Sequence, residues 1–160
     1  MKQKGFTLIE LLVTMGIIAV LTGMAVFNFN EARIRARDVQ RKSDLSQLVK
    51  SMELYKNDTG SYPPSAADFQ KTMLDASYFK AEFVDPRGID WLAYQYAPGN
   101  TLKSYYLMAC LENKADSARA TADKCSNFSN GSSGGADACR CGAGSNLADY
   151  TGVMYIVSNP

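Results

Sequence analysis

The sequence of 160 residues contains no histidine, and this absence excludes common kinds of active site. Histidine is the most frequent general base near neutral pH and the most frequent protein ligand of transition metals. Hydrolytic triads and catalytic zinc sites are therefore not expected, and we predict that the chain is not an enzyme. Carboxylates such as Asp75, Glu82 and Asp85 remain as candidate acid–base groups, but no paired acidic motif supports them.

Charge is missing from one long stretch near the N-terminus. No residue from Leu11 to Phe29 is charged, and as a helix this stretch would be about 28 Å long, close to one hydrocarbon core. Glu10 stands at the start of the stretch, where a carboxylate is costly unless a cation or hydrogen-bond donor meets it. We therefore predict a membrane-spanning helix in which Glu10 needs a partner.

The residues around Glu10 carry a family resemblance. Lys4-Gly5-Phe6-Thr7-Leu8-Ile9-Glu10 follows a short basic leader and resembles the processing signal of type IV pilins and pseudopilins. The resemblance implies that a prepilin peptidase cleaves between Gly5 and Phe6 and methylates the new amino group of Phe6. It also implies that Glu10 pairs with the Phe6 amino group of a neighbouring subunit when a filament assembles.

Two other interpretations of the N-terminus compete with this one. A cleaved secretory signal peptide would use Gly23-Met24-Ala25 as its cleavage site, and a plain signal anchor would not be cleaved. The register of the motif favours the pilin-type signal over both. The positive-inside rule alone would leave the basic segment 33–42 in the cytoplasm, whereas the resemblance places the C-terminal part of the chain outside.

The helix is expected to continue well beyond the apolar stretch. After Phe29 there is no proline or glycine until Gly60, and apolar residues recur every three or four positions. One helix from Phe6 to Asn57 would have 52 residues and a length of about 78 Å. Its apolar positions in the second half are Ile34, Leu45, Leu48, Val49, Met52 and Tyr55.

Basic residues cluster in the first part of that amphipathic half, at Arg33, Arg35, Arg37, Arg41 and Lys42. Acidic residues are interleaved with them and no aromatic platform accompanies them. We interpret the cluster as a solvated helix face that pairs with acidic residues of neighbouring subunits, with support along the helix from Asp38–Lys42 and Asp44–Arg41. Binding of anionic headgroups or DNA is the alternative.

The remainder predicts a small α+β domain. A short helix is expected at 69–76, capped by 65–68 and with Met73 and Leu74 facing inward, and a turn at 85–88. Alternating apolar residues predict a strand at 91–97, and a run rich in aromatic and aliphatic residues predicts a second strand at 105–111. A final strand is expected at 153–157, in the middle or at an edge of a small antiparallel sheet. The fold class is therefore α+β and pilin-like, with a long N-terminal helix packed on the sheet.

Four cysteines lie in or beside a polar segment, 112–150, that cannot bury enough surface to order itself. Cys139 and Cys141 are too close to bridge each other without strain. The predicted disulfides are therefore Cys110–Cys139 with Cys125–Cys141, or Cys110–Cys141 with Cys125–Cys139. A four-cysteine zinc site is less favoured, because paired C-x-x-C knuckles are absent.

No cofactor is expected, and calcium is the one candidate ion. Asp137, Asp149 and backbone carbonyls of residues 142–145 could donate oxygens, but no spaced acidic loop motif is present and a polar loop without metal is favoured.

Four segments follow from these observations: a removed leader (1–5), a transmembrane and filament-core helix (6–29), its amphipathic continuation (30–60) and a globular α+β head (61–160) with a cysteine-containing loop (110–141). The resemblance implies a structural subunit of a type IV pilus-like filament that polymerises through its N-terminal helix. A pseudopilin of a type II secretion or DNA-uptake machine is the alternative, and a membrane-anchored extracellular binding protein is the alternative of another class.

The resemblance also implies partners and a location. The expected partners are further copies of the chain in a helical filament, a prepilin peptidase, an assembly platform protein, an assembly ATPase and the membrane. Nucleic acid is a partner only if the filament takes up DNA. The chain is expected in the cell membrane as a single-pass protein before assembly, and in an extracellular pilus or cell-envelope filament afterwards.

Overall fold

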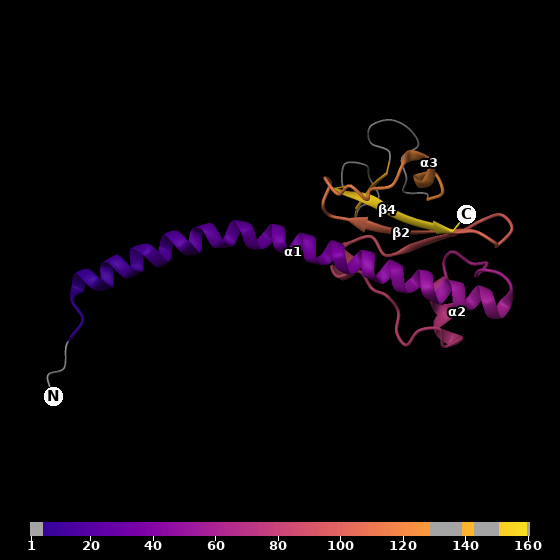
Figure 1. Cartoon of the computed structure of the whole chain (residues 1–160), viewed down its shortest axis with the longest axis horizontal. Helices are drawn as coiled ribbons and strands as arrows, with labels where there is room; N and C mark the ends of the chain where they lie inside the picture. Colours follow the sequence, from indigo (N-terminus) through magenta and orange to yellow (C-terminus); the bar gives the residue numbers. More distant parts are fainter. Residues whose placement is uncertain (1–4, 129–138, 143–150, 160) are drawn as a thin grey trace. The chain divides into compact units, whose positions relative to one another are not determined.

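The computed structural model describes residues 5–128, 139–142 and 151–159. The chain divides into an N-terminal unit, Met1–Ala36, and a C-terminal unit, Arg37–Pro160. Its helices and strands, in chain order, are α1 (Leu8–Thr59), α2 (Phe69–Asp75), the 3-10 helix η1 (Gly88–Asp90), β1 (Gln95–Pro98), β2 (Tyr105–Leu111), α3 (Ala122–Cys125), β3 (Arg140–Cys141) and β4 (Gly152–Asn159) (Figure 1).

Helix α1 has the 52 residues that the sequence predicts, shifted by two positions toward the C-terminus. Gly60 ends it with a positive φ of 81°, and its N–H donates a hydrogen bond to the carbonyl oxygen of Lys56 at 2.8 Å. A residue with a side chain adopts that conformation only with strain, which is why glycine is the usual residue after a helix.

The four described strands form one antiparallel sheet in the order β1-β2-β4-β3. The pairing of β2 with β4 is the longest, from Tyr105 opposite Asn159 to Leu111 opposite Val153. The last strand of the chain therefore occupies the interior of the sheet. This arrangement confirms the α+β prediction, the full extent of the strand at 105–111 and the presence of a final strand.

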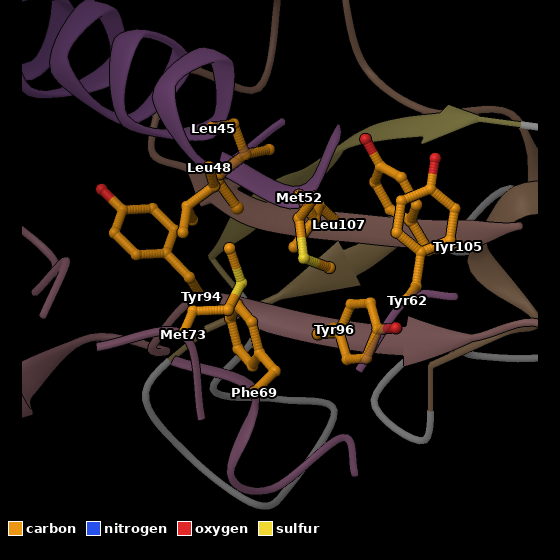
Figure 2. Close-up of a cluster of buried hydrophobic side chains, with 11 residues drawn as sticks. Leu45, Leu48, Met52, Tyr62, Phe69, Met73, Tyr94, Tyr96, Tyr105 and Leu107 are labelled. Carbon is orange, nitrogen blue, oxygen red and sulfur yellow. The ribbon is translucent and has the colours of Figure 1, made fainter. Parts of the chain in front are cut away.

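One face of the sheet packs against the C-terminal half of α1. Leu45, Leu48 and Met52 are completely buried on the helix, and they contact a cluster that includes Leu107 of β2 and aromatic side chains from β1 and α2 (Figure 2). Phe69 stacks on one of these rings, with a centroid separation of 5.1 Å. The predicted three-to-four spacing thus identifies the face of α1 that forms the core.

The opposite face of the sheet carries a second cluster. Because side chains alternate along a strand, Met108 and Cys110 of β2 point away from α1, as do Met154 and Ile156 of β4. They pack with Trp91 and the other three cysteines, all of which are buried. Both faces of β2 are therefore covered, which explains its almost uninterrupted burial.

The predicted strand at 91–97 is wrong over its first half. Only Gln95–Pro98 pairs with β2, and residues before it are held by side-chain hydrogen bonds instead. The indole N–H of Trp91 donates to the carbonyl oxygen of Cys110 at 2.7 Å, and the hydroxyl of Tyr94 donates to Asp44 of α1 at 2.6 Å. The alternating pattern at 91–94 reflects these separate anchors rather than a strand.

Smaller differences concern α2 and the cysteine-containing loop. The predicted helix at 69–76 ends at Asp75, Met73 is buried as expected and Leu74 is only half-buried. Asp68 precedes the helix but makes no side-chain cap; its own N–H donates to the hydroxyl of Ser65 at 3.3 Å. Helix α3 and strand β3 were not predicted, because both are short and lie in a segment with little apolar periodicity.

Candidate functional site

The predicted processing and assembly residues lie at the exposed start of α1. Gly5, Phe6 and Glu10 are all exposed, and Phe6 retains 85% of its accessible surface. The Glu10 carboxylate accepts hydrogen bonds from the backbone N–H of Thr7 at 2.9 Å and from its hydroxyl at 2.7 Å. The backbone N–H of Glu10 donates to the Thr7 hydroxyl oxygen at 3.3 Å.

Thr7 and Glu10 therefore form a capping box, which the sequence analysis missed. The signal for it was present, since Thr-x-x-Glu immediately before an apolar run is the usual form of this motif. In a single chain, the carboxylate of Glu10 already satisfies donors at the first turn of α1. Before any assembly step, the free-energy cost of placing this carboxylate in lipid is therefore smaller than for a carboxylate without hydrogen-bond donors.

The large apolar side chains that the structure describes in the first half of α1 are exposed in the N-terminal unit. In the described part of the chain, α1 is the one helix long and apolar enough to cross a membrane, and none of its most apolar 18-residue window is buried. Exposed fractions along it range from 81% at Leu8 to 53% at Val13. The large exposed side chains are Leu8, Ile9, Leu11, Leu12, Val13, Met15, Ile17, Ile18, Val20, Leu21, Met24 and Phe29.

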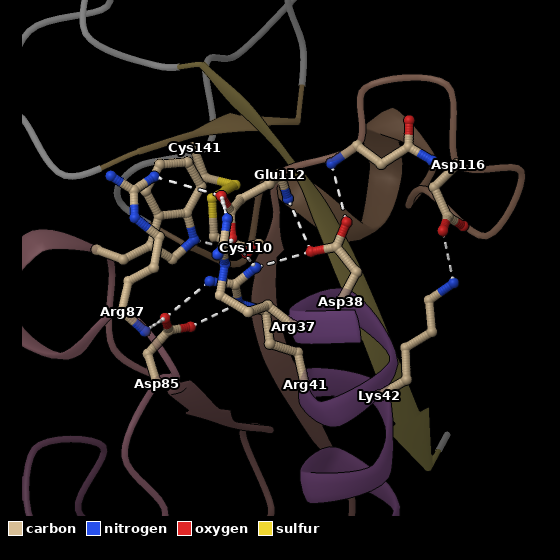
Figure 3. Close-up of polar contacts among 12 residues, drawn as sticks. Arg37, Asp38, Arg41, Lys42, Asp85, Arg87, Cys110, Glu112, Asp116 and Cys141 are labelled. Carbon is tan, nitrogen blue, oxygen red and sulfur yellow. Dashed lines mark hydrogen bonds and ion pairs between the residues drawn. A yellow bond between two sulfur atoms is a disulfide. The ribbon is translucent and has the colours of Figure 1, made fainter. Parts of the chain in front are cut away.

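Farther along α1, in the C-terminal unit, Arg41 is the centre of a buried charged cluster (Figure 3). Its side chain is fully buried and forms a two-pronged ion pair with Asp85, at 2.7 and 2.8 Å. The same guanidinium donates to Asp38 at 2.7 Å and to Glu112 at 2.8 Å. Burial alone lowers the pKa of Arg41, but the hydrogen bonds to Asp85 and Glu112 outweigh it and raise that pKa above its ordinary value.

Glu112, which follows β2, ties a second arginine into the same cluster. Arg37 donates to both of its carboxylate oxygens at 2.6 Å. Burial raises the pKa of Glu112, but hydrogen bonds from Arg37 and Arg41 outweigh it and hold the pKa below the usual range. The carboxylate of Asp38 accepts the backbone N–H groups of Glu112 and Asn113, both at 2.9 Å. The cluster therefore fastens the end of β2 to α1.

Trp91 forms the apolar wall of this cluster. The guanidinium carbons of Arg41 and Arg87 lie 5.5 and 4.5 Å from the centre of its ring. Such cation–π contacts are more favourable where water is excluded, and Trp91 retains only 6% of its accessible surface. Gly88 closes the neighbouring turn through a hydrogen bond from its N–H to the carbonyl oxygen of Asp85 at 2.7 Å, which confirms the predicted turn at 85–88.

These contacts correct the interpretation of the basic segment as a solvated face. Arg41 pairs with Asp38 rather than with Asp44, and Lys42 pairs with Asp116 at 2.7 Å rather than with Asp38. Asp44 instead accepts the Tyr94 hydroxyl. Sequence periodicity could not find Asp116 as the partner of Lys42 or Tyr94 as the partner of Asp44, because these pairs are separated by 74 and 50 residues along the chain. Among the five basic residues of this segment, only Arg33 and Arg35 are exposed.

The cysteines form the second of the two predicted pairings. Cys110 is bonded to Cys141, and Cys125 is bonded to Cys139. The first bond joins the end of β2 to β3 and closes 31 residues, and the second closes 14 residues within that loop. Both bonds lie in the buried cluster on the side of the sheet opposite α1.

The structure tests one of the candidate catalytic carboxylates, whereas the predicted calcium donors lie almost entirely outside the described residues. Asp85 is committed to Arg41, and among the described residues there is no group of three or more histidine, cysteine, aspartate or glutamate side chains that could hold a metal. The predicted calcium donors Asp137 and Asp149, with backbone carbonyls 143–145, lie outside the described residues.

Comparison with known proteins identifies the N-terminal segment first. The family model for the prokaryotic N-terminal methylation motif matches residues 1–26. The type IV wide pilus major component PilA4 of Thermus thermophilus is 44% identical over 64 residues, which are 40% of this chain and 49% of the pilin. The chain thus spans about half the length of that relative.

The type II secretion system core protein G of Pseudomonas aeruginosa is 30% identical over 111 residues, which are 61% of this chain and 76% of that protein. The chain belongs to the type IV pilin and pseudopilin family. The core protein G of Escherichia coli K12 agrees, with 30% identity over 103 residues and 71% of its length. No solved structure gave a significant match to this pilin-family chain.

Family membership confirms the resemblance drawn from residues 4–10 and the pilin-like α+β fold. Type IV pilins and pseudopilins are structural filament subunits rather than enzymes. For this pilin-family chain, the buried carboxylates around Arg41 accordingly belong to the scaffold of the C-terminal unit.

Proposed function

We propose that the chain is the structural subunit of a type IV pilus-like filament and polymerises through its N-terminal helix. In this proposal the leader Met1–Gly5 is removed by a prepilin peptidase, and the new amino group of Phe6 is methylated. The processed subunit waits in the membrane as a single-pass protein, and it enters a cell-envelope or extracellular filament with the help of a platform protein and an ATPase.

The observation that carries the proposal is the uncovered apolar surface of α1 with Glu10 at its start. A helix exposed on all sides cannot remain in water, because burying each large aliphatic side chain is worth about 1.5–3 kcal/mol. Lipid covers the surface before assembly, and the helices of other copies cover it afterwards. The charge of Glu10 is then compensated by the Phe6 amino group of a neighbouring copy, in a setting of low dielectric.

One observation favours the pseudopilin alternative over an extracellular pilus. Similarity to the Thermus pilin covers 64 residues, whereas similarity to core protein G of type II secretion systems extends over as many as 111 residues. The alignment with the Thermus pilin is 12 residues longer than α1, whereas the longer alignments cover about three fifths of this chain and therefore include much more of the C-terminal unit. A secretion pseudopilus is thus the second candidate, with the same processing and the same assembly contact.

The mature N-terminus provides the first test. Mass spectrometry of the protein isolated from cell membranes should give a chain that begins with N-methylated Phe6. An intact Met1 would contradict the proposal and favour the membrane-anchored binding protein. A soluble chain that begins near Ala25 would instead indicate an ordinary signal peptide.

Assembly itself provides the second test. Glu10→Ala should abolish sheared or secreted filaments while the membrane level of the protein stays normal. Thr7→Ala removes only the partner of Glu10 within one chain, and should retain most of the filament yield. Glu31→Ala, at an exposed acidic position after the apolar stretch, is the matched control. Full filament yield from Glu10→Ala would contradict an assembly role for this carboxylate.

A further inference from the structure

The basic segment after the apolar stretch separates into two groups with different surroundings. Arg37, Arg41 and Lys42 are ion-paired inside the C-terminal unit. Arg33 and Arg35 lie in the N-terminal unit and are exposed, and neither forms an ion pair within the described part of the chain. We propose that Arg33 and Arg35 bind the headgroup phosphates of anionic lipids at the end of the membrane span. This proposal rests on the membrane anchoring described under the proposed function.

The position of the two arginines along α1 matches the headgroup layer. Phe29 is the last large apolar residue before Glu31, and Arg33 and Arg35 follow it by about 6 and 9 Å of helix rise. The polar headgroup region adds roughly 5–8 Å to each side of the hydrocarbon core. A helix that carries residues 11–29 through that core therefore holds both guanidinium groups at or just beyond the level of the phosphates.

A contact within the N-terminal unit supports this placement. The guanidinium carbon of Arg33 lies 4.8 Å from the centre of the Phe29 ring, and that ring is 60% exposed. The aromatic ring faces the boundary of the hydrocarbon, and the arginine covers it with its apolar stem and directs its charge outward. Guanidinium groups also suit phosphate, because their planar N–H donors can bind two oxygens at once.

The two arginines are not equivalent. Positions two residues apart on a helix point about 200° away from each other, so Arg33 and Arg35 contact different lipids. Glu31 lies four residues before Arg35 on the same side of the helix and weakens the attraction there. No acidic residue is placed three or four positions from Arg33 on its N-terminal side, where Phe29 and Asn30 stand. Arg33 is therefore the main lipid contact.

The test measures lipid preference in the full chain. The purified protein in detergent micelles is offered phosphatidylglycerol and phosphatidylcholine in competition, and bound lipid is counted by native mass spectrometry. Because a basic residue near a membrane surface gives about fivefold preference for anionic lipid, Arg33→Gln should lower the phosphatidylglycerol preference by about fivefold. Arg35→Gln should lower it less. Arg33→Lys should keep most of it, and 1 M NaCl should remove it, because the Debye length falls to about 3 Å.

Lys50→Gln is the matched control, since Lys50 is an exposed basic residue much farther along α1 and should not affect the preference. Equal binding of both lipids by the native chain, or an unchanged preference in the Arg33→Gln/Arg35→Gln chain, would overturn the proposal. If the native chain showed no lipid preference but bound duplex DNA, and if the two substitutions abolished that binding, the proposal would be wrong and the two arginines would be nucleic-acid contacts. A native chain that never enters membranes would refute the proposed function itself. Failure of the lipid-binding proposal can therefore be distinguished from failure of the proposed function.

Discussion

Arg41→Met is expected to unfold the C-terminal unit at a much lower temperature than the native chain. Methionine fills similar space but leaves the buried carboxylate of Asp85, and part of the charge on Asp38 and Glu112, without its main partner. The native guanidinium makes four hydrogen bonds of 2.7–2.8 Å to these groups. Removing one member of a buried ion pair costs about 3–5 kcal/mol, because the remaining charge stays desolvated.

For a unit of about 120 residues, the entropy of unfolding converts 4 kcal/mol into a fall in Tm of about 15 °C. The assay follows Trp91, the only tryptophan of the chain, whose ring lies 5.5 Å from the Arg41 guanidinium carbon. Its fluorescence is recorded during thermal unfolding of the full chain in detergent micelles. The helical signal of the membrane stretch would persist in detergent, so circular dichroism alone would be less informative.

Two further variants separate the lost ion pair from a general effect of substitution. Adding Asp85→Asn to Arg41→Met neutralises the carboxylate left behind and should restore about 1–3 kcal/mol. Lys50→Met, at an exposed position of the same helix, should remain within about 0.5 kcal/mol of the native chain. If Arg41→Met unfolded within 3 °C (about 1 kcal/mol) of the native chain, the cluster would contribute little to stability and this argument would be refuted.

Three other predictions concern the same unit. Replacing Cys110 and Cys141 by alanine opens a loop of 31 residues and should lower the free energy of unfolding by about 3.5 kcal/mol, measured by urea denaturation. Gly152→Ala should cost about 1–3 kcal/mol in the same assay, because the added methyl group would lie 2.5 Å from a backbone carbonyl oxygen. Hydrogen bonds from basic side chains lower the pKa values of Glu112 and Asp116 despite their burial, so their stabilisation is complete above about pH 4.5 and is lost as the pH falls through the lowered values. The urea midpoint should therefore be level between pH 7 and 5 and decrease below pH 4, and a midpoint that rises on acidification would contradict the assignment.

Local patterns in the sequence were sufficient for the elements that have a clear period. The absence of proline and glycine between Phe29 and Gly60 predicts a helix of the observed length, and the aromatic and aliphatic residues at 105–111 predict all of β2. The close spacing of Cys139 and Cys141 excludes a bond between them and leaves two pairings. Spacing cannot choose between the two, because that choice depends on which cysteine lies in β3 beside β4.

The charged cluster could not have been predicted in the same way. Arg41 finds Asp85 and Glu112 at separations of 44 and 71 residues, and no helical or strand period connects such distances. From its helical position alone, Arg41 is expected at the surface, where charged helix residues usually lie. The capping box at Thr7 and Glu10 is a different case, since its local motif is visible in the sequence and only its meaning for Glu10 required the structure.

The position of β4 has a consequence for the way the sheet is completed. Residues 152–159 lie more than 40 residues after β2 in the sequence, yet they separate β2 from β3 and carry residues of both hydrophobic clusters. Until β4 is in place, both clusters are incomplete and one edge of β2 has unpaired backbone groups. Such an open edge can pair with another chain, so the late-forming contact of β4 with β2 is the step that protects the sheet from aggregation.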